Sequence, residues 1–163
     1  MSDKAKKEAW EWIKAIVEAI IILTVLKFAL RTEIPIAAVA SGSMLPTLER
    51  GDLVFVMGTS PKDVHVGDII VYHSCQGPFI IHRVIAIKYV NGTYYFVTKG
   101  DDNPGTDYWL GQFVNCKTGQ PLPGVPQWRV AGKVVTVGGY VIKIPYLGYV
   151  ALLAFPFLWW LPR

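Results

Sequence analysis

Charged residues are scarce in this sequence: they make up 17% of its 163 residues, whereas a soluble domain usually has about 25%. The sequence also lacks a block of lysine and arginine, internal repeats and low-complexity tracts. Together with a net charge of only +4, these absences argue against a nucleic-acid-binding arm, a disordered chain and a coiled coil. Because 52% of the residues are hydrophobic, we expect part of the chain not to face water.

An apolar run, WEWIKAIVEAIIILTVLKFAL, occupies residues 10–30. At 1.5 Å per residue, its 21 residues match the roughly 30 Å of a hydrocarbon core, so we expect a transmembrane helix. Lys14 and Glu18 lie one turn apart and are expected to pair, and Lys27 is expected to reach the far interface. The alternative is a cleaved signal peptide with Ala-Val-Ala at 38–40 as its cleavage site. A charged segment separates that site from the run, which favours the uncleaved anchor.

The lysines near the start predict the orientation of this anchor. By the positive-inside rule, residues 1–9 form a cytoplasmic tail and the residues after 30 lie outside the cell membrane. These lysines are Lys4, Lys6, Lys7 and Lys14. We expect residues 144–163, a second apolar segment, to form a C-terminal helix that spans back. The alternative is a helix lying in the outer leaflet, since Pro156 would kink it and Trp159 and Trp160 suit an interface.

Residues 31–143 are expected to form one extracytoplasmic domain that is mainly β. β-Branched and aromatic residues dominate several segments, and Asn91-Gly92 is typical of a tight hairpin. The expected strands cover residues 52–57, 68–73, 83–90, 93–98 and 130–137. Residues 101–127, rich in Gly, Pro, Asn and Asp, are expected to form a loop-rich excursion. Cys75 and Cys116 are compatible with either a disulfide or two buried thiols.

Residues 41–48 read SGSMLPTL and follow an extended apolar segment. Gly42 and Pro46 favour a turn there that exposes a serine hydroxyl. Most such segments are only turns. A serine hydroxyl is a weak nucleophile unless a base removes its proton and a third group orients that base. The interpretation as a nucleophile therefore requires both groups elsewhere in the chain.

Three histidines are available as the base. His65 lies in a polar turn and His73 ends a strand, whereas His82 lies between apolar residues in a strand that we expect to be packed. A buried structural histidine is the alternative interpretation of that position. An imidazole has an ordinary pKa near 6.5 and can act as a base at neutral pH without strong perturbation.

Three carboxylates follow the predicted hairpin: Asp101, Asp102 and Asp107. Their spacing does not match an EF-hand loop, because the glycine falls at the wrong position and no glutamate closes the loop. We therefore expect no metal. One of these acids is instead a candidate to accept a hydrogen bond from the imidazole and fix its tautomer.

Four motifs carry a resemblance to a known family. SGSMLPTL, GDIIVY, IHRVI and TKGDDN, in that order behind an N-terminal apolar run, resemble type I signal peptidase of the archaeal and endoplasmic-reticulum branch. The resemblance implies a membrane-bound serine endopeptidase that needs no cofactor. It would remove signal peptides from secreted preproteins and cut after small residues on the outer membrane face. The implied partners are signal peptides and the lipid bilayer, with the secretion channel as a further candidate and no nucleic acid.

The resemblance also implies a role for individual residues. Ser43 would be the nucleophile and His82 the base. Asp107 would be the triad acid and Asp101 a second required acid, with the reverse assignment left open. The Ser41 hydroxyl and the backbone N–H of Ser43 would form the oxyanion hole. The residues implied to line the substrate pockets are Val39, Ala40, Met44, Leu48, Ile80 and Ile81.

Two functions of other classes remain as alternatives. An anchored β domain could bind peptides without catalysis, although a binding module has no need of a serine, a histidine and an acid together. A metal hydrolase would use His73, Cys75 and His82 as ligands.

Overall fold

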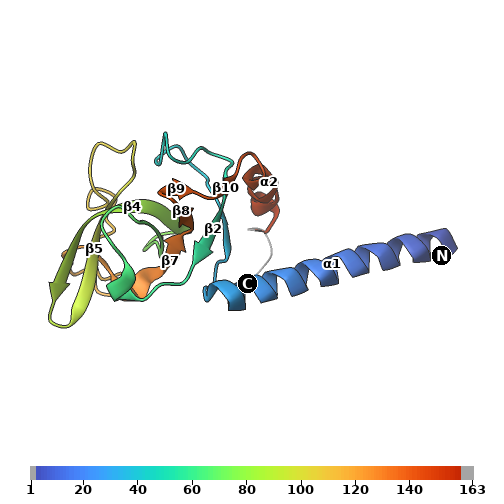
Figure 1. Ribbon diagram of the computed structural model, residues 1–163, viewed down its shortest axis with the longest axis horizontal. Helices are drawn as coiled ribbons and strands as arrows, with labels where there is room; N and C mark the ends of the chain where they lie inside the picture. The colour runs from blue at the N-terminus through green and yellow to red at the C-terminus, as the bar shows by residue number, and fades with distance from the viewer. Residues whose placement is uncertain (1–2, 159–163) are drawn as a thin grey trace.

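The N-terminal apolar run forms one long helix, α1 (Asp3–Leu30), which extends away from the rest of the chain (Figure 1). The computed structural model describes residues 3–158. Within that range, no helix combines the length and the apolar character needed to cross a membrane. The predicted helix at 10–30 is confirmed, although it begins at Asp3 and so includes most of the predicted tail. The predicted membrane span is not confirmed, since Lys14, Glu18 and Lys27 interrupt the apolar sequence. Lys14 also pairs with Glu11, at 2.8 Å, rather than with Glu18 as predicted.

The domain after α1 is built from antiparallel strands, which confirms the mainly β prediction. The main sheet has the order β1-β2-β7-β3-β4-β5-β6, and β10 also pairs with β2. Its strands are β1 (Ile36–Ala38), β2 (Leu53–Met57), β3 (Ile69–His73), β4 (Phe79–Val90), β5 (Thr93–Lys99), β6 (Val125–Pro126), β7 (Val130–Val134) and β10 (Lys143–Ile144). A separate pair joins β8 (Thr136–Val137) to β9 (Tyr140–Val141). Two short 3-10 helices cover Pro61–Asp63 and Gln127–Arg129.

The predicted strands differ from the observed ones in two places. β4 begins at Phe79, four residues earlier than predicted, so His82 lies inside the strand and faces Ile70 of β3. The predicted strand at 130–137 divides at Val135, whose N–H bonds to the Phe55 carbonyl while the chain turns into β8. The hairpin between β4 and β5 is as predicted.

The Asn91-Gly92 turn closes that hairpin. Both residues have positive φ, +48° and +79°, as a two-residue turn of this kind requires. Val90 pairs directly with Thr93 across it.

β3 separates two hydrophobic clusters. Ile69 and Val71 pack in one cluster, while Ile70 and Tyr72 pack in the other. Successive side chains of a strand point to opposite faces, so both faces of the sheet are covered at β3. This explains why its first four residues are all buried. The second cluster lies next to the base and the acid described below.

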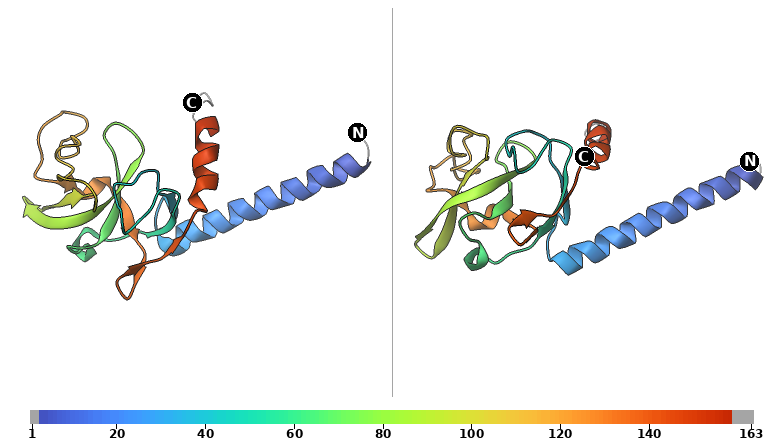
Figure 2. Two further views of the ribbon diagram at one scale, coloured as in Figure 1. Left: turned by 90° about the horizontal axis from the view of Figure 1, so that it is seen from above. Right: turned by 45° about the horizontal axis from the view of Figure 1, so that its top comes forward.

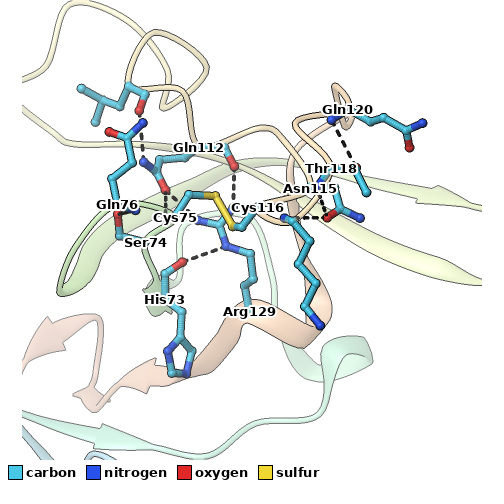
Figure 3. The surroundings of a disulfide bond; sticks show 12 residues. His73, Ser74, Cys75, Gln76, Gln112, Asn115, Cys116, Thr118, Gln120 and Arg129 are labelled. Atoms are coloured by element: carbon cyan, nitrogen blue, oxygen red, sulfur yellow. Dashed lines mark hydrogen bonds between the residues drawn. A yellow bond between two sulfur atoms is a disulfide. The ribbon is translucent and has the colours of Figure 1, made fainter. Parts of the chain in front are cut away.

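Residues 101–127, predicted to form a loop-rich excursion, consist mostly of turns, with an isolated bridge between Val114 and Pro121 before β6. A disulfide joins Cys75 to Cys116, with the sulfur atoms 2.10 Å apart (Figure 3). Of the two possibilities that the sequence left open, the disulfide is therefore the one observed. The bond ties the excursion to the segment between β3 and β4.

The C-terminal apolar segment begins later than predicted. Lys143 and Ile144 form β10 instead, because the Lys143 ammonium pairs with Asp52 at 2.7 Å and holds this segment beside β2. The helix, α2, covers Gly148–Leu158 and contacts β1. Figure 2 shows that α2 leaves the β domain in a direction different from α1. Residues 159–163, including Trp159 and Trp160, lie outside the described range, and the prediction that this segment spans a membrane is not tested.

The segment at 38–40 belongs to the folded domain. Ala38 is paired with Leu53 in the sheet, and Val39 exchanges backbone hydrogen bonds of 2.9 Å with the Gly51-Asp52 turn. Cleavage there would remove an edge strand of the β domain, and this agrees with the preference for an uncleaved segment.

Removing the disulfide should destabilise the domain. The bond closes a loop between residues 41 positions apart. Replacing both Cys75 and Cys116 by serine should lower the free energy of unfolding by about 2–4 kcal/mol, mainly because the unfolded chain gains freedom. Urea unfolding of the full chain in detergent micelles, followed by tryptophan fluorescence, would measure this. The parent under a reducing agent should match the double variant, and equal stability of all samples would contradict the expectation.

Candidate active site

Ser43 lies in the turn that follows β1. Its neighbours Val39 and Met44 are buried in the first cluster and anchor the turn on both sides. The Ser43 carbonyl accepts a hydrogen bond of 3.0 Å from the Asp102 N–H. It approaches Gly100 so closely that a Cβ there would lie 2.5 Å from the carbonyl oxygen. The turn that carries Ser43 is thus held directly against the start of the excursion, and glycine is required at the contact.

His82 projects from β4 toward this turn. Its side chain is almost completely buried, and its Nε2 lies 3.0 Å from the Ser43 Oγ. That distance is within hydrogen-bonding range, so the ring is in place to receive the hydroxyl proton. A buried histidine with only a structural role, the alternative interpretation, does not require a contact with a serine on an exposed turn. The contact with Ser43 therefore argues against that alternative.

Asp107 completes the line of groups on the other side of the ring. Its two carboxylate oxygens lie 2.7 and 2.8 Å from the His82 Nδ1, and the Tyr72 hydroxyl donates to Oδ2 at 2.7 Å. Burial alone would raise the pKa of Asp107, but the hydrogen bond and charge of the His82 ring, followed by the Thr98 and Tyr72 hydroxyls, outweigh it and lower the pKa. The carboxylate therefore stays ionised and holds the proton of the ring on Nδ1.

Asp101 has a different set of partners. Arg83 donates to both of its oxygens, at 2.8 and 2.7 Å, and the Thr47 hydroxyl donates to Oδ2 at 2.5 Å. Burial would raise the pKa of Asp101, but these hydrogen bonds and the Arg83 charge lower it. Asp107, and not Asp101, thus contacts the ring of His82, as the preferred assignment predicted. Asp101 instead ties β4 to the turn that carries Ser43.

Ser41 lies on the open side of the site. Its side chain is exposed, and its Oγ is 3.2 Å from the Ser43 Oγ. A hydroxyl in this position can donate to an oxygen bound next to the nucleophile. The predicted pairing of Ser41 with the Ser43 N–H is therefore compatible with the geometry.

A pocket of about 310 Å³ opens beside Ser43 and His82. Five of the six residues predicted to line it do so: Val39, Ala40, Met44, Ile80 and Ile81. The sixth, Leu48, is wrong as a lining residue, because it is 0% exposed and packs inside the first cluster. Its apolar character serves the core beneath the turn.

The model of the family described as "Signal peptidase, peptidase S26" matches residues 9–92, a range that includes Ser43 and His82. The chain belongs to the peptidase S26 signal peptidase family. Asp101 and Asp107 lie beyond the matched range, so their positions are supported by the geometry of the site.

The chain is also similar to signal peptidase complex catalytic subunits SEC11. It is 36% identical to the one from Candida tropicalis over 124 residues, which cover 73% of this chain and 64% of the relative. Identity to the Schizophyllum commune subunit is 34%, with 74% and 65% covered. Identity to the Colletotrichum graminicola subunit is 32%, with 77% and 66% covered. The similarity confirms the resemblance to this branch, and the chain spans just under two thirds of the length of these relatives.

Several residues of this candidate site were not predicted from the sequence. Tyr72 and Arg83 lie within or beside quoted motifs, GDIIVY and IHRVI, but a motif does not show which side chain meets a distant acid. Phe79, Asn103 and Leu110 line the pocket as well. Asn103 and Leu110 come from the excursion, whose turns give no periodic signal, so only the folded chain reveals their position.

The metal-hydrolase alternative is contradicted by the disulfide. Cys75 is bonded to Cys116 and has no thiolate to offer a metal ion. Over residues 3–158, His, Cys, Asp and Glu side chains also form no group of three that could hold a metal ion.

Replacing Asp101 by asparagine should destabilise the domain in a pH-dependent way. The ion pair with Arg83 would be lost, and we expect the free energy of unfolding to fall by about 1–3 kcal/mol at pH 7. Because folding lowers the pKa of Asp101, this stabilisation is complete above the ordinary aspartate pKa of about 4 and disappears as the pH falls through the lower, folded value. Urea unfolding at pH 7, 5 and 3 would measure it.

The control is Asp102→Asn, which makes the same change at an exposed neighbour and should leave stability unchanged at every pH. A difference between parent and Asp101→Asn that stays constant from pH 7 to pH 3 would contradict the ion-pair explanation.

Proposed function

We propose that this chain is a serine endopeptidase that removes signal peptides from preproteins, cutting after small residues on the outer face of a membrane. The observation that carries the proposal is the continuous line of Ser43, His82 and Asp107, with contacts of 3.0 and 2.7 Å. These residues come from three segments far apart in the chain. A fold that only binds peptides has no need to bring them together.

The geometry supports a proton-transfer sequence. His82 removes the Ser43 proton through Nε2 while the hydroxyl oxygen attacks the carbonyl carbon of the scissile amide. The ring then carries a positive charge, which the ionised Asp107 stabilises across Nδ1. His82 returns the proton to the leaving amine, and the acyl group remains on Ser43. Water, activated by the same ring, hydrolyses this ester.

An oxyanion develops on the substrate during both steps. The Ser41 hydroxyl, close to the Ser43 Oγ, and the Ser43 backbone N–H are proposed to donate to this oxygen. Such donors matter most when the surrounding turn holds them in advance. The buried anchors Val39 and Met44 and the hydrogen bond from Asp102 provide that support.

The pocket supports the proposed preference for small side chains. Its lining combines the short side chains of Ala38 and Ala40 with the branched side chains of Ile80 and Ile81. β1 is at the end of the strand order, so an extended substrate can add beside it as a further strand. The relatives bear the name signal peptidase complex catalytic subunit, and signal peptides are accordingly the substrates that we propose for this chain.

α1 is proposed to hold the domain at the membrane, with its N-terminal end on the cytoplasmic side. Its residues are all unburied by the β domain, although many are large and apolar. Two polar groups within it are satisfied locally: Lys14 pairs with Glu11, and the Thr24 hydroxyl donates to the Ile20 carbonyl at 2.7 Å. Lys27 is close enough to the end for its ammonium to reach an interface. The bilayer, and the channel that delivers the preprotein, are the proposed partners.

Replacing Ser43 by alanine should abolish cleavage. We expect kcat/KM to fall by at least about 10⁴-fold, because the nucleophile is lost while the fold is unchanged. The assay is cleavage of a purified preprotein with Ala-x-Ala before the cut, analysed by mass spectrometry of the products. A preprotein with phenylalanine as the residue before the cut should be resistant.

The matched control is Ser60→Ala, which removes a hydroxyl from an exposed position outside the site. It should cleave as the parent does. If Ser43→Ala cleaves equally well, the chain is not a serine peptidase of this type, and a peptide-binding domain becomes the better explanation.

Charges placed in the apolar part of α1 should release the chain from membranes. The parent should float with phosphatidylcholine vesicles and remain with them at pH 11. Replacing Ile20 and Val25 by aspartate should abolish this retention, since a charge near the bilayer centre costs roughly 2.5–3.5 kcal/mol. Flotation followed by immunoblotting would measure the bound fraction. Release of the parent by high salt alone would show surface adsorption and contradict insertion.

A further inference from the structure

Tyr72 contacts the catalytic acid from the interior of the domain. It is fully buried in β3, and its hydroxyl donates to Asp107 Oδ2 at 2.7 Å. Asp107 is itself 0% exposed. Two side-chain donors, the His82 ring and the Tyr72 phenol, thus contact one desolvated carboxylate at under 3 Å. Neither donor can be replaced by solvent while the site keeps this arrangement.

The two donors differ in whether their proton moves. The His82 ring gains and loses a proton in the reaction proposed above. Burial, and then the neighbouring Asp107 charge, raise the pKa of Tyr72 far above its ordinary value. The phenol therefore remains protonated near neutral pH and donates to the carboxylate. It is a constant partner of the acid.

Arg129 fixes the phenol ring and the acid's own segment at the same time. Its guanidinium is buried and lies 5.6 Å from the centre of the Tyr72 ring. It also donates to the His73 carbonyl at 2.8 Å and to Gln112, at 2.7 Å to the carbonyl and 2.6 Å to the side-chain oxygen (Figure 3). The Gln112 N–H in turn bonds to the Asp107 carbonyl at 3.0 Å.

We propose that Tyr72 is a positioning residue of the active site, which holds one oxygen of Asp107 and weakens the attraction of this carboxylate for the protonated His82 ring. A hydrogen bond to a carboxylate stabilises its negative charge and makes it a weaker partner for a neighbouring cation. Loss of the phenol hydroxyl should therefore strengthen the attraction between Asp107 and the protonated ring. The consequence for catalysis rests on the proposed function, but the coupling between Tyr72 and the ring does not.

The remaining charged groups around this pair stay in place when the phenol is changed. Arg129 lies over the ring of Tyr72, and Asp101, paired with Arg83, acts on the His82 ring from the side of the turn that carries Ser43. Because these charges are common to parent and variant, a difference between the two reports the phenol hydroxyl.

The first experiment measures the ring directly, without substrate. The full chain in detergent micelles, carrying His65→Gln and His73→Gln so that His82 is the remaining histidine, is titrated by NMR of the imidazole Cε1–H. Tyr72→Phe should raise the midpoint of this titration by about half a pH unit or more, because Asp107 loses a hydrogen bond that stabilised its charge. Tyr94→Phe makes the same change in the same hydrophobic cluster, away from Asp107, and should leave the midpoint unchanged.

A second variant should shift the midpoint of the imidazole titration in the opposite direction. Site-specific 2,3-difluorotyrosine at position 72 keeps the ring and makes the phenol a stronger donor, so the midpoint should move below that of the parent. Opposite shifts from two nearly isosteric changes cannot result from a general loosening of the fold. The thermal unfolding midpoint, recorded on each sample, identifies the fraction that is folded.

The kinetic readout links this coupling to the peptidase reaction. Tyr72→Phe should lower kcat about tenfold with KM unchanged, and the acid limb of the kcat/KM profile should move upward with the NMR midpoint. An unmoved midpoint in folded Tyr72→Phe, or shifts of the same sign in both variants, would overturn the proposal. Inactivity of the parent toward preproteins would contradict only the proposed function. The NMR shifts would still decide the role of Tyr72.

Discussion

The buried carboxylate of Asp107 imposes the main constraint on this structure. A carboxylate removed from water is strongly unfavourable unless charged or polar donors replace the lost solvent. Here the donors come from neighbouring strands, Tyr72 from β3 and His82 from β4. The antiparallel register that pairs Ile70 with His82 and Tyr72 with Ile80 must therefore be correct to the residue. The contacts of the proposed active site therefore also specify the register of the sheet.

The same constraint acts indirectly on the turn that carries Ser43, through the segment that leads to Asp107. The segment that leads to Asp107 touches the turn at Gly100 and donates to the Ser43 carbonyl from Asp102. Asp101, which lies between these two residues, forms an ion pair with Arg83 of β4. A shift of the turn would thus displace the acid's segment, and a shift of that segment would displace the serine. This explains how a hydroxyl on a surface turn is kept within 3.0 Å of a ring in the core.

Much of the fold was predictable because its signals are local. β-Branched runs located the strands, and Asn91-Gly92 located the hairpin turn. The start of β4 and the end of β7 were missed, since pairing with β3 and with β2, and not propensity, decides them. The C-terminal apolar segment was predicted to begin at residue 144, but Ile144 belongs to β10, where pairing with β2 and the ion pair between Lys143 and Asp52 hold it.

The candidate site shows the same contrast between features that the sequence reveals and features that only the folded chain reveals. Ser43, His82 and Asp107 were predicted as a set because the order of motifs resembles a family. The choice between Asp107 and Asp101 needed the folded chain, in which one acid meets the ring and the other meets Arg83. Leu48 was misjudged because an apolar residue next to a catalytic turn serves a core and a pocket equally well in a sequence. Tyr72 was missed because a buried phenol in a strand looks like ordinary packing.

The bond between Cys75 and Cys116 has a topological consequence for these groups. It closes a covalent ring of polypeptide that contains the base and both acids, whereas Ser43 lies outside that ring. In an oxidised chain that has lost its fold, the imidazole and the carboxylates are still confined to a limited volume, but the serine is not. The proposed triad can therefore form only when the segment that carries Ser43 has folded against this ring of polypeptide.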